Sequence, residues 1–179
     1  MVIALAGRRV DAPDARAARF PLTNVDLVSR RLDELFDREK ATALVSSAAC
    51  GADLLALRVA GARRMRRRIV LPFDRARFRS TSVTDRPGDW GPLYDKILAE
   101  LDPGHDVVTL EGYSDGAEAY LAVNRVILQH AVGLAAQLGT ETMAVLVWEG
   151  APRGSDDTTA AFGQEAHGLG LELGEAKTL

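Results

Sequence analysis

Five short runs of almost purely apolar residues, separated by helical patterns, constrain the fold more than any other feature of the sequence. The runs have the length of strands and lie at 2–7, 42–47, 68–73, 106–110 and 142–150. A strand with one solvated face alternates apolar and polar residues, whereas a strand of a parallel sheet covered on both faces is a continuous apolar run. The pattern therefore predicts a parallel sheet buried between helices.

The segments between the runs carry helical signals. Helices are expected over 24–38 with Thr23 or Asn24 as the cap, over 51–64, 91–101, 115–138 with Asp115 as the cap, and 158–167. A last strand is expected at 169–173, and 74–90 has the composition of a polar loop. We predict an α/β fold, a Rossmann-like three-layer sandwich whose mostly parallel sheet of five to six strands is flanked by helices in one domain over 1–179.

Composition excludes several function classes. The net charge of -3 and a pI near 5.6 argue against broad nucleic-acid affinity, and the basic run at 63–68 is interpreted as a helix end that solubilises the surface. Cys50 is the single cysteine and the three histidines show no ligand spacing, so neither a metal nor a cofactor is expected. No apolar stretch reaches about 20 residues, which predicts no membrane span, and the N-terminus is a poor signal peptide; a cytoplasmic location is expected.

The exit of the first predicted strand carries Gly7, Arg8 and Arg9. The carboxyl ends of parallel strands share one edge of the sheet, and ligands bind there near the switch point in strand order. A guanidinium group at that edge can pair with two oxygens of a phosphate. The alternative is that these arginines are solvated loop residues.

The exit of the second strand reads SSAACGAD over 46–53 and crowds small side chains before a helix. Small residues let a ligand approach the backbone and leave the first N–H groups of the helix uncovered. Asp53 either favours the helix dipole or accepts hydrogen bonds from ribose hydroxyls. The spacing is neither GxGxxG nor a P-loop, and Cys50 is interpreted as a packed thiol. The candidate ligand-binding residues here are Ser47, Ala48, Gly51 and Asp53.

Two further strand exits offer candidates. After the third strand, a lid with anion donors is predicted from Pro72, Phe73, Arg79 and Ser82, with Phe73 either stacking on a base or plugging the core. After the fifth strand, small residues precede a helix start, where N–H groups can face phosphate while the aspartates cap the helix or face sugar hydroxyls or Mg²⁺. The candidates there are Glu149, Gly154, Ser155, Asp157 and Thr158.

Together the stretches AGRR, VSSAACGADLLALRVA, RIVLPF and WEG…GSDDTTAAFGQEA resemble the SLOG superfamily, within the Lonely Guy and DNA-processing-protein-A group of Rossmann-like domains. The resemblance implies a bacterial signalling domain that senses nucleotides or their derivatives. It places 47–53 on the family's glycine-rich loop, Gly7 and Arg8 on its first strand exit, and 154–158 on its phosphate-side turn. The PGGxGTxxE signature of the phosphoribohydrolase branch is absent, so no catalytic residue is assigned.

Three hypotheses follow. The first is a sensor that binds a small nucleotide or nucleotide derivative without turnover. The second is an enzyme that cleaves the N-glycosidic bond of a nucleoside monophosphate, with Asp53, Glu149 or Glu165 as the acid. The third is an interaction module, because the helix over 115–138 is more apolar than one buried face requires, which predicts a homodimer.

Overall fold

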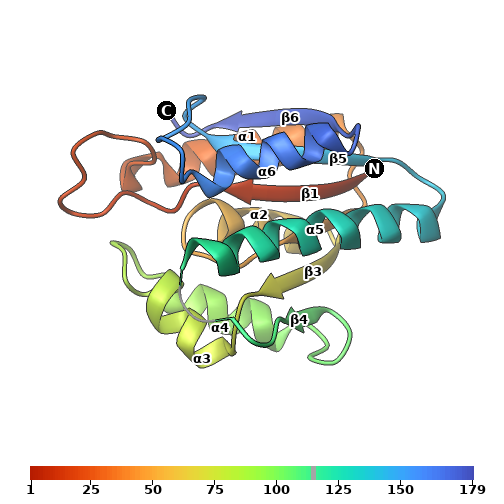
Figure 1. The fold of residues 1–179 in the computed structure, drawn as a ribbon, viewed down its shortest axis with the longest axis horizontal. Helices are drawn as coiled ribbons and strands as arrows, with labels where there is room; N and C mark the ends of the chain where they lie inside the picture. The colour runs from red at the N-terminus through yellow and green to blue at the C-terminus, as the bar shows by residue number, and fades with distance from the viewer. Residues whose placement is uncertain (114–115) are drawn as a thin grey trace.

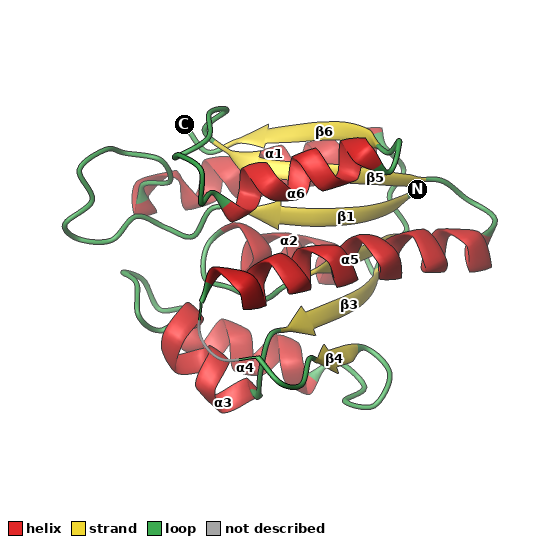
Figure 2. Ribbon diagram, in the orientation of Figure 1, coloured by secondary structure: helices red, strands yellow, loops and turns green. Residues whose placement is uncertain are grey.

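The computed structural model describes residues 1–113 and 116–179, which form a central sheet between two layers of helices (Figures 1 and 2). The sheet order is β4-β3-β2-β1-β5-β6 and every neighbouring pair is parallel. The strands are β1 (Val2–Gly7), β2 (Ala43–Ser46), β3 (Arg66–Leu71), β4 (Val107–Thr109), β5 (Thr142–Trp148) and β6 (Glu172–Lys177). This confirms the predicted α/β, Rossmann-like three-layer sandwich.

The helices divide between the two faces of the sheet. One face carries α5 (Ala117–Leu138) and α6 (Thr158–Gly168), and the other carries α1 (Val25–Arg38) and α2 (Ala52–Ala62), with α4 (Gly91–Ala99) beside α2. Three short turns of helix complete the chain: η1 (Leu22–Asn24), α3 (Arg75–Phe78) and the π-helical η2 (Arg79–Val83).

Two separate cores explain why the strand sequences are apolar without interruption. In β1, Ile3 and Leu5 pack into the core under α1, α2 and α4, whereas Val2 and Ala4 pack into the core under α5 and α6. The strands β2 and β5 alternate in the same way. Successive side chains point to opposite faces, so a strand covered on both faces needs apolar residues at every position.

Element boundaries differ from the prediction where pairing rather than hydrophobicity sets them. The last strand is 172–177 instead of 169–173, because these residues pair with Met143–Trp148, whereas the exposed Leu169 precedes the strand. Strand β3 begins two residues earlier than predicted, because Arg66 already pairs with Ala43. It ends before Pro72, which has no N–H to donate to the sheet.

The predicted polar loop after β3 is partly helical. The carboxylate of Asp74 accepts a hydrogen bond from the Arg77 backbone N–H at 2.9 Å, which caps α3, and the chain continues directly into η2. At α1 the predicted side-chain cap is wrong, because the Asn24 amide donates instead to the Thr178 carbonyl at 2.9 Å. The predicted cap Asp115 lies outside the described residues.

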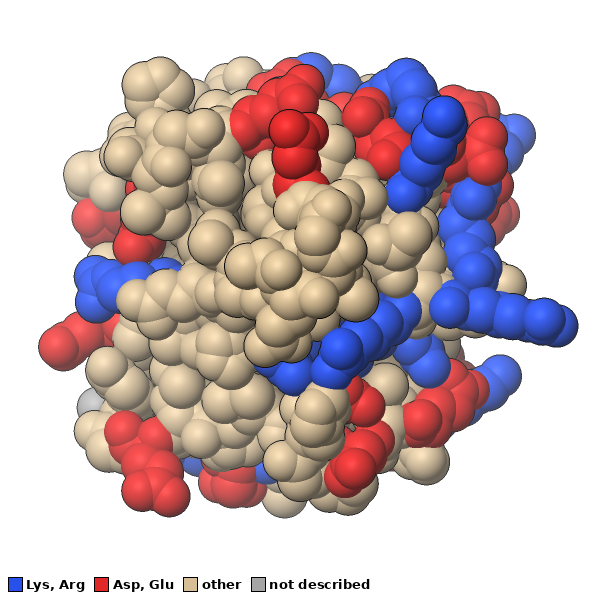
Figure 3. All heavy atoms as spheres, turned by 90° about the vertical axis from the view of Figure 1, so that its right-hand side faces the viewer, with Lys and Arg blue, Asp and Glu red and all other residues tan. Residues whose placement is uncertain are grey.

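The basic run at 63–68 lies at the amino edge of the sheet, between α2 and β3, on the face shown in Figure 3. Arg63 donates to Asp33 at 2.6 Å and to Asp37 at 3.1 Å, and Arg67 donates to Glu100 at 2.9 Å. Acidic and basic side chains mix on this face, and two arginines of the run are paired with carboxylates of neighbouring elements.

Helix α5 buries one side and leaves apolar side chains on the other. Leu121, Val132 and Leu138 are exposed. A homodimer through this helix stays a prediction. In the described part of the chain, no helix combines the length and apolar character needed to cross a membrane.

Candidate functional site

A cavity of about 580 Å³ opens at the carboxyl ends of the central strands. Strand order reverses at β1, which has β2 on one side and β5 on the other, so the loops leaving neighbouring strands diverge there. The wall is built from the end of β1 and the loop after it, the turn between β2 and α2, and the first turns of α5 and α6. Its lining residues are Leu5, Ala6, Gly7, Arg8, Arg9, Val10, Asp11, Ala12, Ala15, Arg16, Ala17, Arg19, Ser47, Ala49, Asp53, Arg86, Tyr120, Val123, Asn124, Ile127, Arg153, Thr158 and Thr159.

Gly7 allows three elements to meet at the base of this cavity. A Cβ at Gly7 would lie 2.4 Å from the Ala52 Cβ and 2.8 Å from the Val147 Cβ, closer than carbon atoms approach. Gly51 has a similar role at the N-terminus of α2, where φ is +93° and a Cβ would lie 2.8 Å from the Arg8 carbonyl oxygen. The sequence interpretation of small residues as space-makers therefore has a packing basis: they let α2 approach β1.

We expect Gly7→Ala to lower the free energy of unfolding by about 1–3 kcal/mol, the usual cost of overpacking a core. Gly133→Ala is the matched control, because a Cβ there meets nothing within 4 Å and alanine favours a helix interior. That variant should be neutral or more stable by up to about 1 kcal/mol. Urea unfolding measures both changes, and equal stability of the two variants would contradict the crowding at Gly7.

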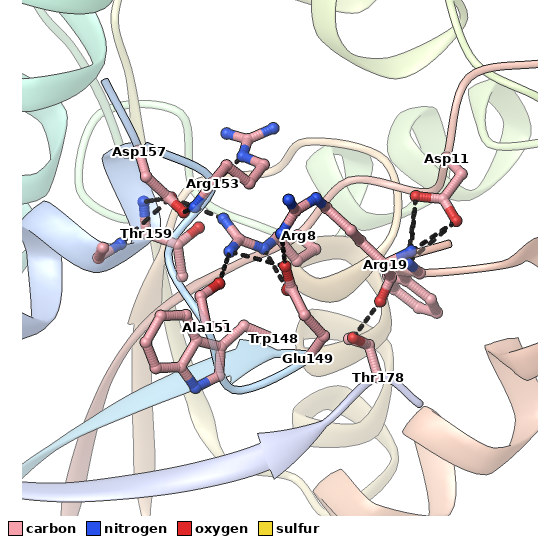
Figure 4. Close-up of polar contacts among 12 residues, drawn as sticks. Arg8, Asp11, Arg19, Trp148, Glu149, Ala151, Arg153, Asp157, Thr159 and Thr178 are labelled. Atoms are coloured by element: carbon pink, nitrogen blue, oxygen red, sulfur yellow. Dashed lines mark hydrogen bonds and ion pairs between the residues drawn. The ribbon is translucent and has the colours of Figure 1, made fainter. Parts of the chain in front are cut away.

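Arg8 ties the exit of β1 to the exit of β5 and the start of α6 (Figure 4). Its Nε donates to Glu149 Oε2 at 2.6 Å and its Nη1 donates to Asp157 Oδ1 at 2.6 Å. Its Nη2 donates to Glu149 Oε1 at 3.2 Å and to the Ala151 carbonyl at 2.9 Å. The three charged side chains are almost entirely buried. Most of the donors of Arg8 are thus engaged within the protein, so the guanidinium acts first as a clamp between loops.

The two carboxylates of this clamp are held in the ionised form. Burial acts to raise the pKa of Asp157, but hydrogen bonds from Arg8 and from the backbone N–H groups of Arg153 and Ala160 outweigh it and hold the pKa at about 2. Burial also acts to raise the pKa of Glu149, and hydrogen bonds from Arg8 and Arg19 bring it below its ordinary value. Neither group is suited to donate a proton at neutral pH.

Asp157 is also the N-cap of α6, as the sequence predicts. Its Oδ1 accepts from the backbone N–H groups of Thr159 at 3.0 Å and Ala160 at 3.2 Å, and its Oδ2 accepts from that of Arg153 at 2.7 Å. The N–H groups at the start of this helix are therefore partly satisfied by the protein's own carboxylate.

The loop after β1 forms one side of the cavity. The Asp11 carboxylate accepts from the backbone N–H groups of Arg19 and Phe20, and the Asp11 N–H donates to the Phe20 carbonyl at 2.9 Å, which closes the base of the loop. Arg19 also donates from its side chain to Glu149. The loop is thereby fixed at its base while its exposed tip, which includes Arg16, reaches along the opening.

Positive charge dominates the cavity wall. Among the described residues, the lining contains six arginines and two aspartates. Three of these arginines have no close ion pair within the described part of the chain. Arg153 Nε lies 3.8 Å from Asp157 Oδ2, Arg86 Nε lies 3.7 Å from Asp85 Oδ2, and Arg16 lies on the exposed loop tip. Burial, followed by the charge of Arg8, lowers the pKa of Arg153.

Asp53 contributes a buried carboxylate to the same wall. It is 6% exposed; its Oδ2 accepts from the Ala49 backbone N–H at 3.2 Å and its Oδ1 has no hydrogen-bond partner in the described structure. Burial raises the pKa of Asp53 to about 7, although the Ala49 N–H and the charge of Arg9 act in the opposite direction. Among the carboxylates considered as acids from the sequence, Asp53 lines the cavity, whereas Glu165 pairs with Arg125 on the surface at 3.3 Å.

The structure brings some of the sequence candidates together and separates others. Gly7, Arg8, Ser47, Asp53 and Thr158 line the cavity. Ala48 is buried in the core, Gly51 packs against the Arg8 carbonyl, and Glu149 and Asp157 hold Arg8. Ser82 is buried and its hydroxyl shares a hydrogen bond of 2.9 Å with that of Tyr120. Ala48, Gly51, Ser82, Glu149 and Asp157 are not among the lining residues, and neither are the remaining candidates Pro72, Phe73, Arg79, Gly154 and Ser155.

Each of the outlying side chains has a different local environment. Phe73 packs in the core against Phe78, with ring centroids 6.1 Å apart. Of the two alternatives that the sequence left open, Phe73 therefore fills the core and does not offer its ring to a base. Arg79 makes a two-pronged pair with Asp95, both bonds at 2.9 Å. Gly154 and Ser155 are exposed in the loop before α6, where the Ser155 hydroxyl donates to Asp156.

Sequence reasoning missed Arg16, Arg19, Arg86 and Arg153, and also Tyr120 and Asn124 from the first turns of α5. The density of arginine in GRRVDAPDARAAR, directly after a strand, is a signal that could have identified the loop. No comparable local signal exists for Asn124, which is buried and donates to the Thr158 carbonyl at 2.8 Å, because only the fold brings α5 to α6.

Comparisons with known proteins yield a weak structural likeness. No protein-family model matches the chain, and no curated protein matches it at a significant level. Among solved structures, the chain is similar to the X-ray structure of DNA processing protein A from Streptococcus pneumoniae, with 15% sequence identity and a TM-score of 0.40. The alignment covers 98% of this chain and 58% of that one, so the chain spans little more than half of that protein.

Proposed function

We propose that the chain is a SLOG-type domain that binds a small nucleotide or nucleotide derivative in this cavity without turning it over. The observation that carries the proposal is the excess of arginine on the wall of a cavity at the switch point of a parallel sheet. An anion in that position would reduce the mutual repulsion of the guanidinium groups, and a volume of about 580 Å³ suits a ligand of nucleotide size.

The arginines divide into two sets with different roles in this proposal. Arg8 and Arg19 are committed to Glu149, Arg9 is committed to Asp85 and the Thr81 carbonyl, and these three arginines shape the site. Arg16, Arg86 and Arg153 line the cavity without a close carboxylate partner in the described structure, and they are the side chains that would meet phosphate.

Thermal unfolding in the presence of a ligand panel tests the proposal. The panel contains ribonucleoside mono-, di- and triphosphates, cyclic nucleotides and ADP-ribose derivatives. A ligand present at about 100 times its Kd should stabilise the protein by about 2.7 kcal/mol, which corresponds to several degrees in Tm. The triple variant with glutamine at 16, 86 and 153 should lose this shift, whereas Arg30→Gln, an exposed site on α1, should keep it. No shift with any member of the panel would contradict the proposal.

Hydrolysis of an N-glycosidic bond is the second candidate, and one observation favours it. Asp53 lies on the wall with a pKa of about 7, the range in which a carboxyl can serve as a general acid at neutral pH. Release of free base from a nucleoside monophosphate by the wild type, and its loss in Asp53→Asn, would favour turnover over binding alone.

A further inference from the structure

Asp53 is placed so that its partner must come from outside the protein. Its Oδ1 is buried at the cavity wall with no hydrogen-bond partner among the described residues, while Oδ2 is engaged by Ala49. Buried polar atoms in folded proteins nearly always have a partner, so a carboxylate oxygen without one, on a residue that lines a cavity, points to a ligand group. The side chain is 6% exposed, which excludes bulk water as its ordinary environment.

The chemistry of a carboxylate restricts what that ligand group can be. A donor bound at Asp53 favours its ionised form, which only accepts hydrogen bonds, and a phosphate oxygen also only accepts, so an ionised Asp53 and a phosphate repel each other. The phosphate of a nucleotide must therefore lie toward the arginines, and a donor must face Asp53. In a nucleotide the donors are ribose hydroxyls and the N–H groups of the base.

A neighbouring arginine selects between these donors. Arg9 lines the same cavity and its charge acts on Asp53. Its Nη groups donate to the Thr81 carbonyl and to Asp85, which leaves the buried Nε as the donor without a partner in the described structure. A single hydroxyl oxygen can accept from a guanidinium and donate to a carboxylate at the same time, whereas a base needs two neighbouring atoms, an N–H group and a ring nitrogen or carbonyl, to do both. An acceptor beside a donor thus complements the vicinal hydroxyls of ribose. The small neighbours Ser47 and Ala49 leave the wall open to a sugar ring.

We propose that Asp53 accepts a hydrogen bond from a ribose hydroxyl, so that the cavity selects ribonucleotides over their deoxy counterparts. This inference rests on the proposed nucleotide-binding function and specifies which part of the ligand faces which wall. A hydrogen bond to a charged acceptor corresponds to an affinity ratio of about 10- to 100-fold.

The test compares the Kd values of ribonucleotides with those of their deoxy forms, because a single affinity would not report on the ribose hydroxyls. Isothermal titration of the wild type with adenosine and guanosine 5′-monophosphates and diphosphates, each as the ribo, 2′-deoxy and 3′-deoxy form, gives the ratios of Kd. We expect at least one deoxy form to bind about 10- to 100-fold more weakly than the ribonucleotide. In Asp53→Ala that ratio should fall to about 1, and in Asp53→Asn, which keeps a neutral acceptor oxygen, it should be intermediate.

Controls separate this inference from the function on which it rests. Asp26→Asn, the same chemical change at an exposed position of α1, should leave the ratio unchanged. Asp53→Asn keeps the size of the side chain, so it reports on discrimination if the alanine variant does not fold. Equal binding of ribo and both deoxy forms by the wild type, or full discrimination by Asp53→Ala, overturns the ribose inference alone. Failure of the wild type to bind any nucleotide overturns both.

Discussion

Arg8→Met is expected to lower the free energy of unfolding by about 3–5 kcal/mol, the largest effect of any single substitution considered for this protein. Methionine fills much of the same space as arginine, so the loss of stability comes from removal of the positive charge. Without the guanidinium, Glu149 and Asp157 remain buried, with Arg19 as the one cation paired with Glu149 and Arg153 at 3.8 Å as the one cation near Asp157 in the described structure. Removing one partner of a buried ion network leaves the others uncompensated, which costs far more than an exposed pair contributes.

The pH dependence of this loss identifies its source. Asp157 has a pKa of about 2 in the folded protein and an ordinary value of 3.8. A lowered folded pKa contributes stability that is present above the unfolded pKa and lost as the pH falls through the folded value. The difference between wild type and Arg8→Met should therefore be full at neutral pH and shrink as the pH falls from about 4 toward 2.

Urea unfolding followed by circular dichroism, at several pH values, measures the effect. Arg79→Met is the matched control, because it removes a guanidinium with equally good geometry toward Asp95 on the exposed surface, where ion pairs contribute little. A loss in Arg8→Met no larger than that in Arg79→Met would show that the clamp does not stabilise the loops.

Asp53→Asn is expected to stabilise the protein at neutral and alkaline pH. The pKa of Asp53 is raised from 3.8 to about 7 by burial, so the folded state binds this proton more tightly than the unfolded state does. The stability that the protonated form contributes is complete below pH 3.8 and is lost as the pH rises to 7. With 1.36 kcal/mol for each pKa unit, the advantage of the asparagine variant should grow by about 4 kcal/mol between pH 4 and pH 8.

The difference in unfolding free energy between the variant and the wild type, measured from pH 4 to pH 8, isolates Asp53 from the other titrating groups. Asp26→Asn should show no such trend, because that carboxylate is exposed. A difference that stays flat over this range would mean that the Asp53 carboxyl is not desolvated in the folded protein. If a bound ribonucleotide raised the free energy of unfolding of the wild type to that of Asp53→Asn, the lower stability caused by the Asp53 carboxylate would be linked to ligand binding.

A residue that lowers stability at the wall of a cavity is informative about function. Aspartate at this position costs the fold more above neutral pH than asparagine of the same size, and its second oxygen makes no hydrogen bond within the described structure. Proteins accept such local conflicts mainly at functional sites. Arg8, in contrast, serves the fold and the site together, because it holds the loops that form the cavity.

Much of the architecture could be predicted from the sequence, because the signals that specify it are local. The apolar runs of β1, β2 and β5 reflect burial on both faces, and this one pattern predicts parallel pairing, flanking helices and a shared edge where the strands end. The cap at Asp157 was predictable for the same reason, since its partners follow within three residues. The ends of β3 and β6 were not, because the neighbouring strand in the sheet decides which residues pair.

The composition of the candidate site depends on tertiary structure. Arg8 contacts Glu149 and Asp157, which lie 141 and 149 residues away in the sequence. No local pattern predicts that the N–H groups of Arg8 donate to these carboxylates and not to a ligand. Phe73 enters the core and Arg79 pairs with Asp95 for the same kind of reason. The sequence alone determined which edge of the sheet collects the polar loops, because strand burial and helix crossovers are written in short-range periodicity. Which side chains on that edge remain available to a ligand was decided only by folding, because charges and hydrogen bonds are satisfied between residues that are distant in the chain.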